Sequence, residues 1–267
     1  MSVDTDELGE GPSWHDGLLT WVDIERGRLR RWRPADGFED TRELGAPLSF
    51  AVPRQRGGWA VGRRDRIGLV APDGEESTLM QVADPPPDTR FNDAKCDAAG
   101  RLWAGTMSTA RRPGDGRLYR VEPNGDAIEA LSATTISNGL AWSPDSALFY
   151  FVDSPTQAID VFDFELDRGR IANRRRFAEI DPRDGLPDGL TVDAEGGVWV
   201  CLFGGGCVRR YDSNGSLEAV VRLPVPRPTS VAFGGADLDR LYVTSAGGGI
   251  QEIAAGVRGL PVNRFPA

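Results

Sequence analysis

The sequence predicts an all-β protein, a six-bladed β-propeller with four antiparallel strands per blade. The first observation is a repeat in which a polar lead residue precedes, by ten to twelve positions, an aromatic that opens a short apolar run. The pairs are Glu10 with Trp21, Ser49 with Trp59, Asn92 with Trp103, Asn138 with Tyr150, Asp188 with Trp199 and Ser230 with Tyr242. The second is the spacing of the aromatics, 38, 44, 47, 49 and 43 residues, which is the period of a propeller blade. The third is that Gly or Pro interrupts the chain about every dozen residues, which excludes amphipathic helices over nearly the whole length.

Each repeat, taken in order, begins with its lead residue in a short apolar strand, turns at Gly with Asp or Pro nearby, and resumes in an aromatic strand. The six segments span residues 9–23, 48–62, 91–106, 137–153, 187–202 and 229–245. Outer strands follow in patterns such as those of residues 116–131 and 206–221, where VEPNG and YDSNG form tight turns. Four strands per repeat make a blade.

The alternative with the same local signature is a β-sandwich, which also separates short strands by turns. Six copies in one register favour the ring, and we expect residues 1–267 to form a single domain. A ring needs closure, and we expect a terminal strand from residues 1–8 or 256–267 to complete a blade.

Composition limits the partners. The net charge of −9 argues against nucleic acid or an anionic membrane surface, since both require a basic face. No apolar stretch approaches the roughly 18 residues needed to span a bilayer, and the acidic N-terminus is unlike a secretory leader, so we expect a cytoplasmic protein. The three cysteines lack paired spacing and are expected to be free, buried thiols. The oligomeric state is not readable, although a monomer is plausible.

The lead residues are expected to meet on the axis of the ring. Each has a structural alternative: Asp188 and Asn138 precede Gly in turn-like dipeptides, and Asn92 could cap a turn. Their common phase in the repeat favours a shared site, because a carboxylate at a propeller axis is costly unless it is paired or bound to metal. Glu10, Asn138 and Asp188 are therefore predicted to bind one divalent cation. Such oxygen donors suit Ca²⁺, Mg²⁺ or Mn²⁺; Zn²⁺ and Fe²⁺ are less favoured because neither His nor Cys contributes.

The single histidine excludes other catalytic machinery. His15 is expected at the outer turn of the first blade, as a surface residue. Without a second histidine, Ser-His-Asp catalysis and histidine-based metal sites are effectively excluded. Any hydrolysis must therefore depend on carboxylate and metal.

Several long motifs resemble the family of SMP-30, regucalcin and gluconolactonase. They are GEGPSW, RFNDAKCDAAGRLWAGTM, ISNGLAWS, ANRRRFAEI, PDGLTVDAEGGVWV and GLPVNRF, which occur in the family's order from Gly9 to about Phe265. The resemblance implies a six-bladed propeller with one divalent metal on its axis that hydrolyses sugar lactones.

The resemblance also assigns roles. It places the metal ligands on Glu10, Asn138 and Asp188, with Ca²⁺ favoured, the substrate contacts on Arg90 and Asn92, and the general acid/base on Asp188. Two departures stand out. After AGTM, Ser108-Thr109 stands where animal members have a substrate-contacting Glu, and residues 243–252 are shorter than the usual excursion.

The expected function is metal-dependent hydrolysis of an aldonolactone, such as gluconolactone or a pentonolactone, to its aldonic acid. Two alternatives remain at this point: a phosphotriesterase-like hydrolase that uses the same cleft, and a non-catalytic calcium-binding propeller.

Overall fold

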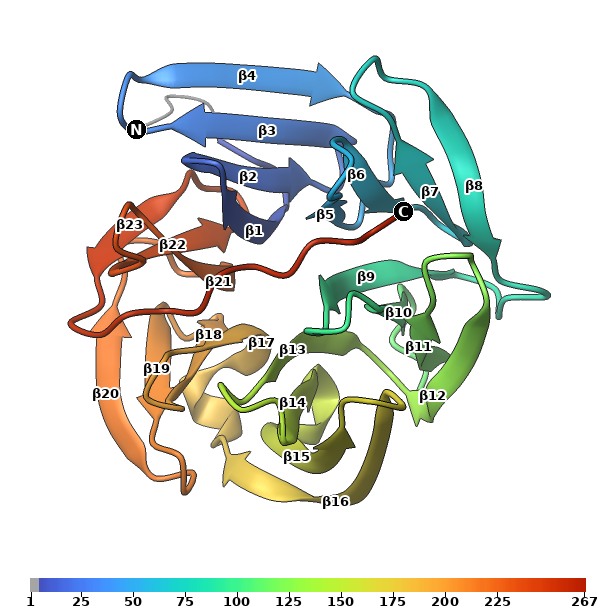
Figure 1. The fold of residues 1–267 in the computed structure, drawn as a ribbon. Coiled ribbons are helices and arrows are strands. Elements are labelled where there is room, and N and C mark those ends of the chain that lie inside the picture. Colours follow the sequence, from blue (N-terminus) through green and yellow to red (C-terminus); the bar gives the residue numbers. More distant parts are fainter. Residues whose placement is uncertain (1–4) are drawn as a thin grey trace.

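A computed structural model describes residues 5–267 and confirms the six-bladed propeller (Figure 1). Six separate antiparallel sheets surround a central axis, and each is built from one continuous stretch of chain. This arrangement excludes the β-sandwich. Within the described residues, no helix is long and apolar enough to cross a membrane.

The first three blades each have four strands, numbered from the axis outward. Blade 1 contains β1 (Gly9–His15), β2 (Leu18–Asp23), β3 (Arg28–Arg33) and β4 (Phe38–Glu43). Blade 2 contains β5 (Ala51–Pro53), β6 (Trp59–Gly62), β7 (Arg66–Val70) and β8 (Glu76–Gln81). Blade 3 contains β9 (Thr89–Cys96), β10 (Leu102–Ser108), β11 (Gly116–Val121) and β12 (Ala127–Thr134).

The remaining blades follow the same order. Blade 4 contains β13 (Ser137–Trp142), β14 (Leu148–Asp153), β15 (Ala158–Glu165) and β16 (Arg170–Glu179). Blade 5 contains β17 (Leu186–Val192), β18 (Val198–Phe203), β19 (Cys207–Tyr211) and β20 (Leu217–Arg222). Blade 6 contains β21 (Pro228–Gly234), β22 (Arg240–Ser245) and β23 (Gln251–Ala254). Two short 3₁₀ helices, η1 (Ser154–Thr156) and η2 (Pro182–Asp184), connect strands of blades 4 and 5.

The hydrophobic core lies between the blades. Each of six buried clusters joins two adjacent blades, and together they complete the circle. The repeated aromatics occupy these interfaces: Trp199 packs with β21 and β22 of the next blade, and Tyr242 packs with blade 1. The six repeated aromatics are thus buried in five of the six blade contacts, and Trp21 and Tyr242 share the contact between blades 6 and 1.

Buried aspartates organise the turns between first and second strands. Asp97 is fully buried and accepts hydrogen bonds from the backbone N–H of Ala99 and Arg101, the Arg101 guanidinium and the Trp103 indole N–H. Asp193 makes the equivalent set with Trp199 in blade 5. The DAxGxxW pattern thus fixes the turn and the orientation of the interblade Trp together.

Ring closure differs from the prediction. Blade 6 has three strands within residues 5–267, and no terminal strand is added to it. Instead, Asp6 exchanges backbone hydrogen bonds with the β22–β23 connection, its N–H donating to the Gly248 carbonyl (3.1 Å) and its carbonyl accepting from Gly247 (3.0 Å). The Trp14 ring stacks on Tyr242 at 5.5 Å between centroids. Side-chain packing and a loop contact therefore close the ring.

The C-terminal residues 256–267 cross one face of the ring (Figure 1). Gly259 bridges to Asp193 in blade 5, and Phe265 bridges to Arg54 in blade 2. The Phe265 side chain is fully buried in the cluster between blades 2 and 3. We call residues 256–267 the strap.

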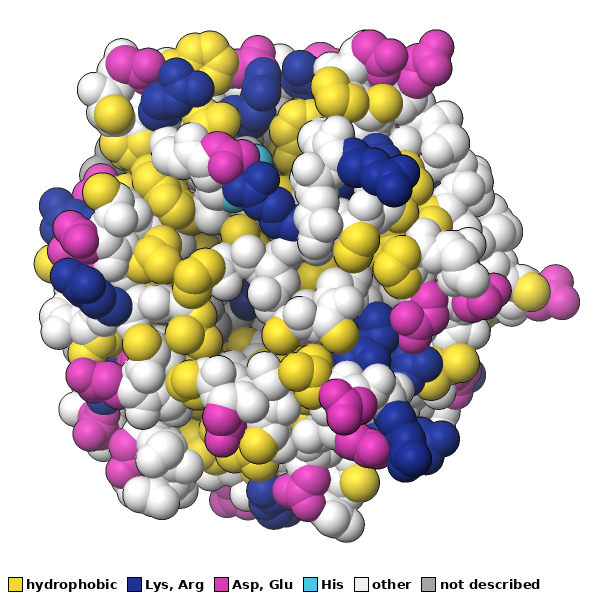
Figure 2. Space-filling view, viewed as in Figure 1, with side chains coloured by type: hydrophobic (Ala, Val, Ile, Leu, Met, Phe, Trp, Pro, Cys, Tyr) yellow, Lys and Arg dark blue, Asp and Glu magenta, His cyan; other side chains and the backbone are white. Residues whose placement is uncertain are grey.

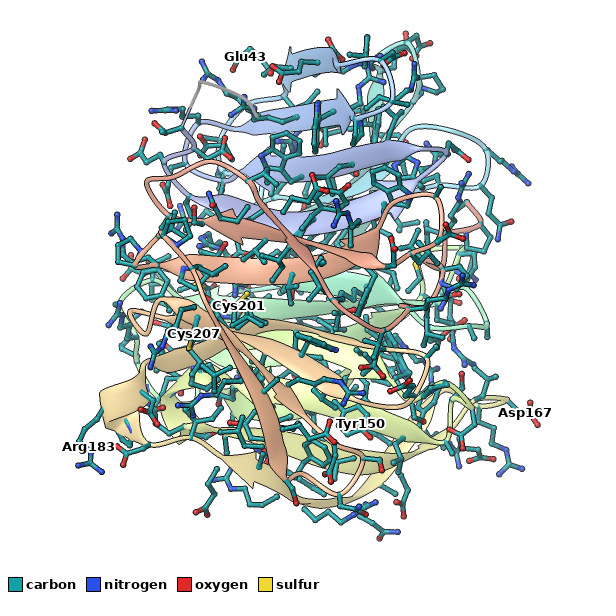
Figure 3. The ribbon with its side chains drawn as sticks, turned by 90° about the vertical axis from the view of Figure 1, so that its left-hand side faces the viewer. Glu43, Tyr150, Asp167, Arg183, Cys201 and Cys207 are labelled. Atoms are coloured by element: carbon teal, nitrogen blue, oxygen red, sulfur yellow. The ribbon has the colours of Figure 1, made fainter. Side chains whose placement is uncertain are left out.

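The inner strands begin on the opposite face. Figure 3 shows Asp167, in the β15–β16 turn, on one face of the ring and Arg183, in the connection that leads to β17, on the other. The same view shows Cys201 and Cys207 on the neighbouring strands β18 and β19. All three cysteines are buried and free, as expected.

Candidate functional site

The predicted site residues lie near the starts of the inner strands and are buried around the axis. Glu10 lies on β1, Asn138 on β13 and Asp188 on β17, and their exposed fractions are 9%, 5% and 7%. Arg90 and Asn92 lie on β9 and are equally buried. Polar side chains from four inner strands, distant in the sequence, are thereby placed at one end of the central channel.

A β-bulge marks this level of the ring. In β17, Asp188 and Gly189 together lie opposite the single residue Cys201 of β18. The same two-against-one pattern occurs in four other inner strands, at Gly11–Pro12, Asn92–Asp93, Asn138–Gly139 and Thr229–Ser230. Bulges turn side chains out of the regular alternation and are frequent beside active sites.

The turn interpretation of the Asn-Gly and Asp-Gly dipeptides is therefore wrong. Both dipeptides lie within inner strands. A Cβ at Gly139 would come within 2.5 Å of the backbone nitrogen of Leu190, and one at Gly189 within 2.2 Å of the Ser230 hydroxyl oxygen. Glycine is required here because neighbouring inner strands approach closely at the bulges.

Glu10 and Asp188 form a coupled pair of buried acids. Burial, followed by the negative charges of Asp188 and Asp93, raises the pKa of Glu10 well above its usual range. Burial and the charge of Asp93 likewise raise the pKa of Asp188, while a hydrogen bond from Asn138 opposes the rise. The two acids thus interact electrostatically, and a bound proton or cation would offset the cost of burying both negative charges.

The donor atoms fit a hard cation. The Asn138 side-chain nitrogen donates to the Ser154 hydroxyl (3.1 Å), which directs its oxygen away from that contact. The Asn138 side-chain oxygen and Oδ1 of Asp188 are buried without a hydrogen-bond partner. Unsatisfied buried oxygens are rare and suit a ligand that supplies positive charge. Among residues 5–267, no group of three or more His, Cys, Asp or Glu is placed to hold a metal ion.

Arg90 and Asn92 are held in place beside the acids. The Arg90 guanidinium donates to the Asn92 side-chain oxygen and to the Phe91 carbonyl, both at 2.8 Å. Asn92 in turn donates to the Ser137 carbonyl (3.0 Å), which ties β9 to blade 4. Burial lowers the pKa of Arg90, and the charges of Glu25, Glu10 and Asp188 oppose that shift. Its remaining N–H groups are available for a ligand's hydroxyl groups.

Asp93 and Lys95 belong to the same electrostatic group, and the sequence analysis did not single them out. Asp93 is buried, its Oδ1 accepts from the Ala94 N–H (2.7 Å), and its Oδ2 has no partner. Lys95 reaches from β9 to the Leu190 carbonyl on β17 (2.5 Å), and burial lowers its pKa. The sequence signal that could have identified them is their position next to Asn92 in FNDAK, because Asp93 and Asn92 form one bulge.

Three other residues differ from or refine the expectations. His15 is the last residue of β1 rather than part of an outer turn, and its side chain is 11% exposed. Burial lowers its pKa. The prediction that His15 is a surface residue is therefore wrong. Ser108 is fully buried and accepts from the Arg112 N–H (3.1 Å), while Thr109 donates to the Asp88 carbonyl (2.8 Å). At the position where animal members carry the Glu, this chain therefore has side chains that secure a turn.

The fold and this site define a β-propeller with oxygen donors gathered on its axis. Over residues 8–247 the chain matches the family described as SMP-30/Gluconolactonase/LRE-like region, and it belongs to that family. It is similar to the pentonolactonase XacC of Haloferax volcanii, with 40% identity over 253 residues that cover 92% of this chain and 84% of the relative. It is also similar to regucalcin of Danio rerio, with 37% identity over 245 residues that cover 90% and 83% of the two chains.

The fold similarity is equally extensive. The solved structure of a calcium-binding protein, regucalcin, from Agrobacterium tumefaciens has a TM-score of 0.94 and 26% identity, with coverage of 99% of this chain and 95% of that one. The resemblance seen in the sequence motifs is thus confirmed at the level of family and fold.

Proposed function

We propose that this protein is a metal-dependent lactonase that hydrolyses a sugar lactone, an aldonolactone such as gluconolactone or a pentonolactone, to the aldonic acid. Membership in a family that includes a pentonolactonase supports the reaction class. The structural observation that supports the proposal is the electrostatic interaction of buried Glu10 with Asp188, together with the unpartnered buried oxygens of Asn138 and Asp188.

Glu10, Asn138 and Asp188 would hold the cation through two carboxylates and one amide oxygen. Ca²⁺ is favoured because all donors are hard oxygens and the relatives include a regucalcin described as calcium-binding. When bound, a divalent cation polarises a lactone carbonyl and offsets the negative charge that develops on its oxygen. Its positive charge would also keep both carboxylates ionised despite their burial.

Asp188 is the proposed general base and acid. One carboxylate oxygen takes a proton from the attacking water as the new C–O bond forms, and the same proton then passes to the ring oxygen as the lactone C–O bond breaks. The product is the open-chain hydroxy acid, so atoms and protons balance.

Arg90 and Asn92 would position the substrate. Their mutual hydrogen bond and the anchor to Ser137 fix the two side chains before substrate arrives. Fixed donors lower the entropic cost of orienting a polyol, and they discriminate between lactones by where the ring hydroxyls lie. A neutral lactone would be the substrate and a small molecule the only required partner.

The test is acid release measured by pH-stat from gluconolactone, xylonolactone and paraoxon, with Ca²⁺ or with EDTA. We expect lactone turnover by the wild type with Ca²⁺, loss of turnover in EDTA, and loss in Asp188→Ala. The matched control is Asp167→Ala, an exposed aspartate in the β15–β16 turn, which should retain activity.

The other outcomes identify the alternatives. Turnover of paraoxon without lactone turnover would support a phosphotriesterase. If calorimetry detects Ca²⁺ binding but no ester is cleaved, the protein is a non-catalytic calcium-binding propeller and the lactonase proposal is wrong.

A further inference from the structure

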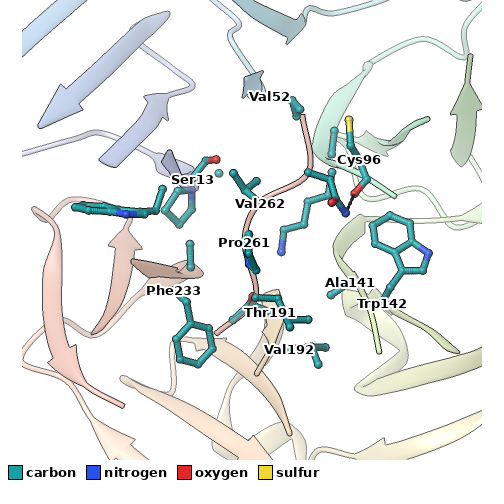
Figure 4. Close-up of a pocket in the computed structure, with 18 of the residues that line it drawn as sticks. Ser13, Val52, Cys96, Ala141, Trp142, Thr191, Val192, Phe233, Pro261 and Val262 are labelled. Carbon is teal, nitrogen blue, oxygen red and sulfur yellow. Dashed lines mark hydrogen bonds between the residues drawn. The ribbon is translucent and has the colours of Figure 1, made fainter. Parts of the chain in front are cut away.

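A cavity occupies the strap side of the central channel. It has a volume of about 320 Å³ and extends from bulge residues of the inner strands, Gly11, Pro12, Asp93 and Ser230, to the C-terminal halves of those strands. Figure 4 shows Val52, Ala141, Val192 and Phe233 around it, contributed by four different blades. Glu10, Asn138 and Asp188 are not among its lining residues.

The strap forms the outer cover of this cavity. Pro261 and Val262 cross the opening in Figure 4, and the Asn263 side chain donates to the Cys96 carbonyl (3.3 Å), which holds the strap against blade 3. Figure 2 shows the same face as a surface that is hollowed near its middle, with hydrophobic side chains around the hollow. The cavity is therefore partly enclosed and apolar at its mouth.

The inner end of the cavity carries unsatisfied polar groups. Asp93 lines it, and its Oδ2 is buried without a partner; Ser13, on β1, also lines it with a buried, unpartnered hydroxyl. Both side chains are at least nine-tenths buried. Buried polar atoms normally have partners, so two such atoms in one apolar cavity point to a ligand that supplies hydrogen bonds.

Charge and volume define the ligand class. Lys95 and Asp93 both line the cavity with opposite charges, so its interior offers little net charge and a charged ligand would lose its hydration without compensation. A cavity of about 150 Å³ accommodates benzene, so about twice that volume suits a bicyclic molecule. The apolar walls require that most of this molecule be apolar.

We infer that the strap-side half of the channel is a second binding site, for a neutral, largely apolar molecule of bicyclic size that donates a hydrogen bond to Asp93. The site adjoins the proposed lactone site at Asp93 and Lys95, whereas Glu10, Asn138 and Asp188 do not line it. Its occupancy does not depend on lactone hydrolysis, so either proposal can fail without the other.

Binding of 2-naphthol tests the inference, with 2-methoxynaphthalene as the matched probe that lacks the donor. Both are titrated by fluorescence and by calorimetry into the full-length protein with Ca²⁺ present. We expect saturable one-to-one binding of 2-naphthol, at least about tenfold tighter than that of its methyl ether, because one probe satisfies a buried acceptor and the other does not. Absence of saturable binding, or equal affinity for the two probes, would overturn the inference.

Cavity-filling variants locate the probe. Ala232 and Thr191 line the cavity and are only partly buried, so Ala232→Phe or Thr191→Phe adds volume into it. Each variant, checked for native circular dichroism, is expected to weaken 2-naphthol at least tenfold. Ala254→Phe, on the outer strand of the same blade as Ala232, is the control and should bind as the wild type does. Unchanged binding by both folded cavity variants would place the probe elsewhere and refute the assignment.

Asp188→Ala separates this site from the lactone site. The variant removes the proposed catalytic carboxylate, which does not line the cavity. We expect 2-naphthol affinity within about twofold of the wild type even though lactone turnover is lost. Loss of probe binding in this variant would instead assign the probe to the axial acid cluster.

Discussion

Replacing Asp188 by Asn should stabilise the metal-free protein. Asp188 is 7% exposed, and burial and the charge of Asp93 raise its pKa. At an effective dielectric constant of 20, two like unit charges repel by about 4 kcal/mol at 4 Å and about 2 kcal/mol at 8 Å. Glu10 and Asp93 contribute repulsion and Arg90 contributes attraction, so about one repulsive interaction remains uncompensated. We expect the free energy of unfolding to rise by about 2 kcal/mol at pH 8 in EDTA.

The gain should depend on pH. A carboxyl whose pKa is raised by folding contributes stability that is present below its unfolded pKa and is lost as pH rises through the folded value. Asp188 is of this kind, so the wild type loses stability with rising pH and the Asn variant loses less. The advantage of Asp188→Asn should therefore approach zero near pH 4 and increase toward pH 8.

Thermal unfolding followed by circular dichroism measures this effect. For a protein of this size, about 2 kcal/mol corresponds to a rise in Tm of roughly 4–8 °C. Asp167→Asn, in an exposed turn, is the control and should change the stability by less than about 0.5 kcal/mol. With Ca²⁺ at about 100 times its Kd, the wild type should gain about 2.7 kcal/mol and the Asn variant much less, which reverses their order. A lower Tm for Asp188→Asn than for the wild type in EDTA at pH 8 would refute this reasoning.

Three further predictions concern the scaffold. His15 is the single histidine, and burial lowers its pKa, so its imidazole proton resonance should titrate in NMR with a midpoint below 6.5. The stability that His15 contributes should be present above pH 6.5 and decline as the pH falls through that midpoint. A midpoint at or above 6.5 would contradict its burial. Asp97→Ala leaves the Trp103 indole N–H and the Arg101 guanidinium without their acceptor, so denaturant unfolding should show a loss of about 3–5 kcal/mol, against less than about 0.5 kcal/mol for the exposed Asp167→Ala. Phe265→Ala removes a fully buried ring that anchors the strap and should cost about 3–5 kcal/mol in the same assay; a loss below about 1 kcal/mol would show that the strap is not fixed by this residue.

The blade architecture could be predicted from the sequence because its cause is local and repeated. Trp103 and Trp199 each follow a DAxGxxW turn, and each fills one contact between blades. A repeat of this kind fixes both the strand order and the side of the sheet that faces the neighbouring blade. The lead residues Glu10, Asn92, Asn138 and Asp188 occupy the same position within their repeats, which predicted that they would lie at one level of the axis.

Other features depend on contacts that no local pattern contains. The bulges arise where neighbouring inner strands approach closely, so Asn138-Gly139 resembles a hairpin turn in sequence although it lies inside a strand. The strap meets blades 5 and 2, which lie far from it in the chain, and within residues 5–267 the sixth blade has three strands. Lys95 resembles an ordinary strand residue in sequence, because nothing near it in the chain indicates that its amine donates to the Leu190 carbonyl of another blade.

The axial cluster explains why a ring is needed to build this site. Glu10, Asp93 and Asp188 face Arg90 and Lys95, so full ionisation of these five groups leaves one excess negative charge in a buried setting. A flexible chain would separate such acids, because their repulsion opposes any single contact that could hold them together. Here each acid lies on a different inner strand, and the six interblade cores fix those strands independently of the charges. The packing between blades thus sustains an unfavourable charge arrangement at the axis, which the cation proposed above would offset.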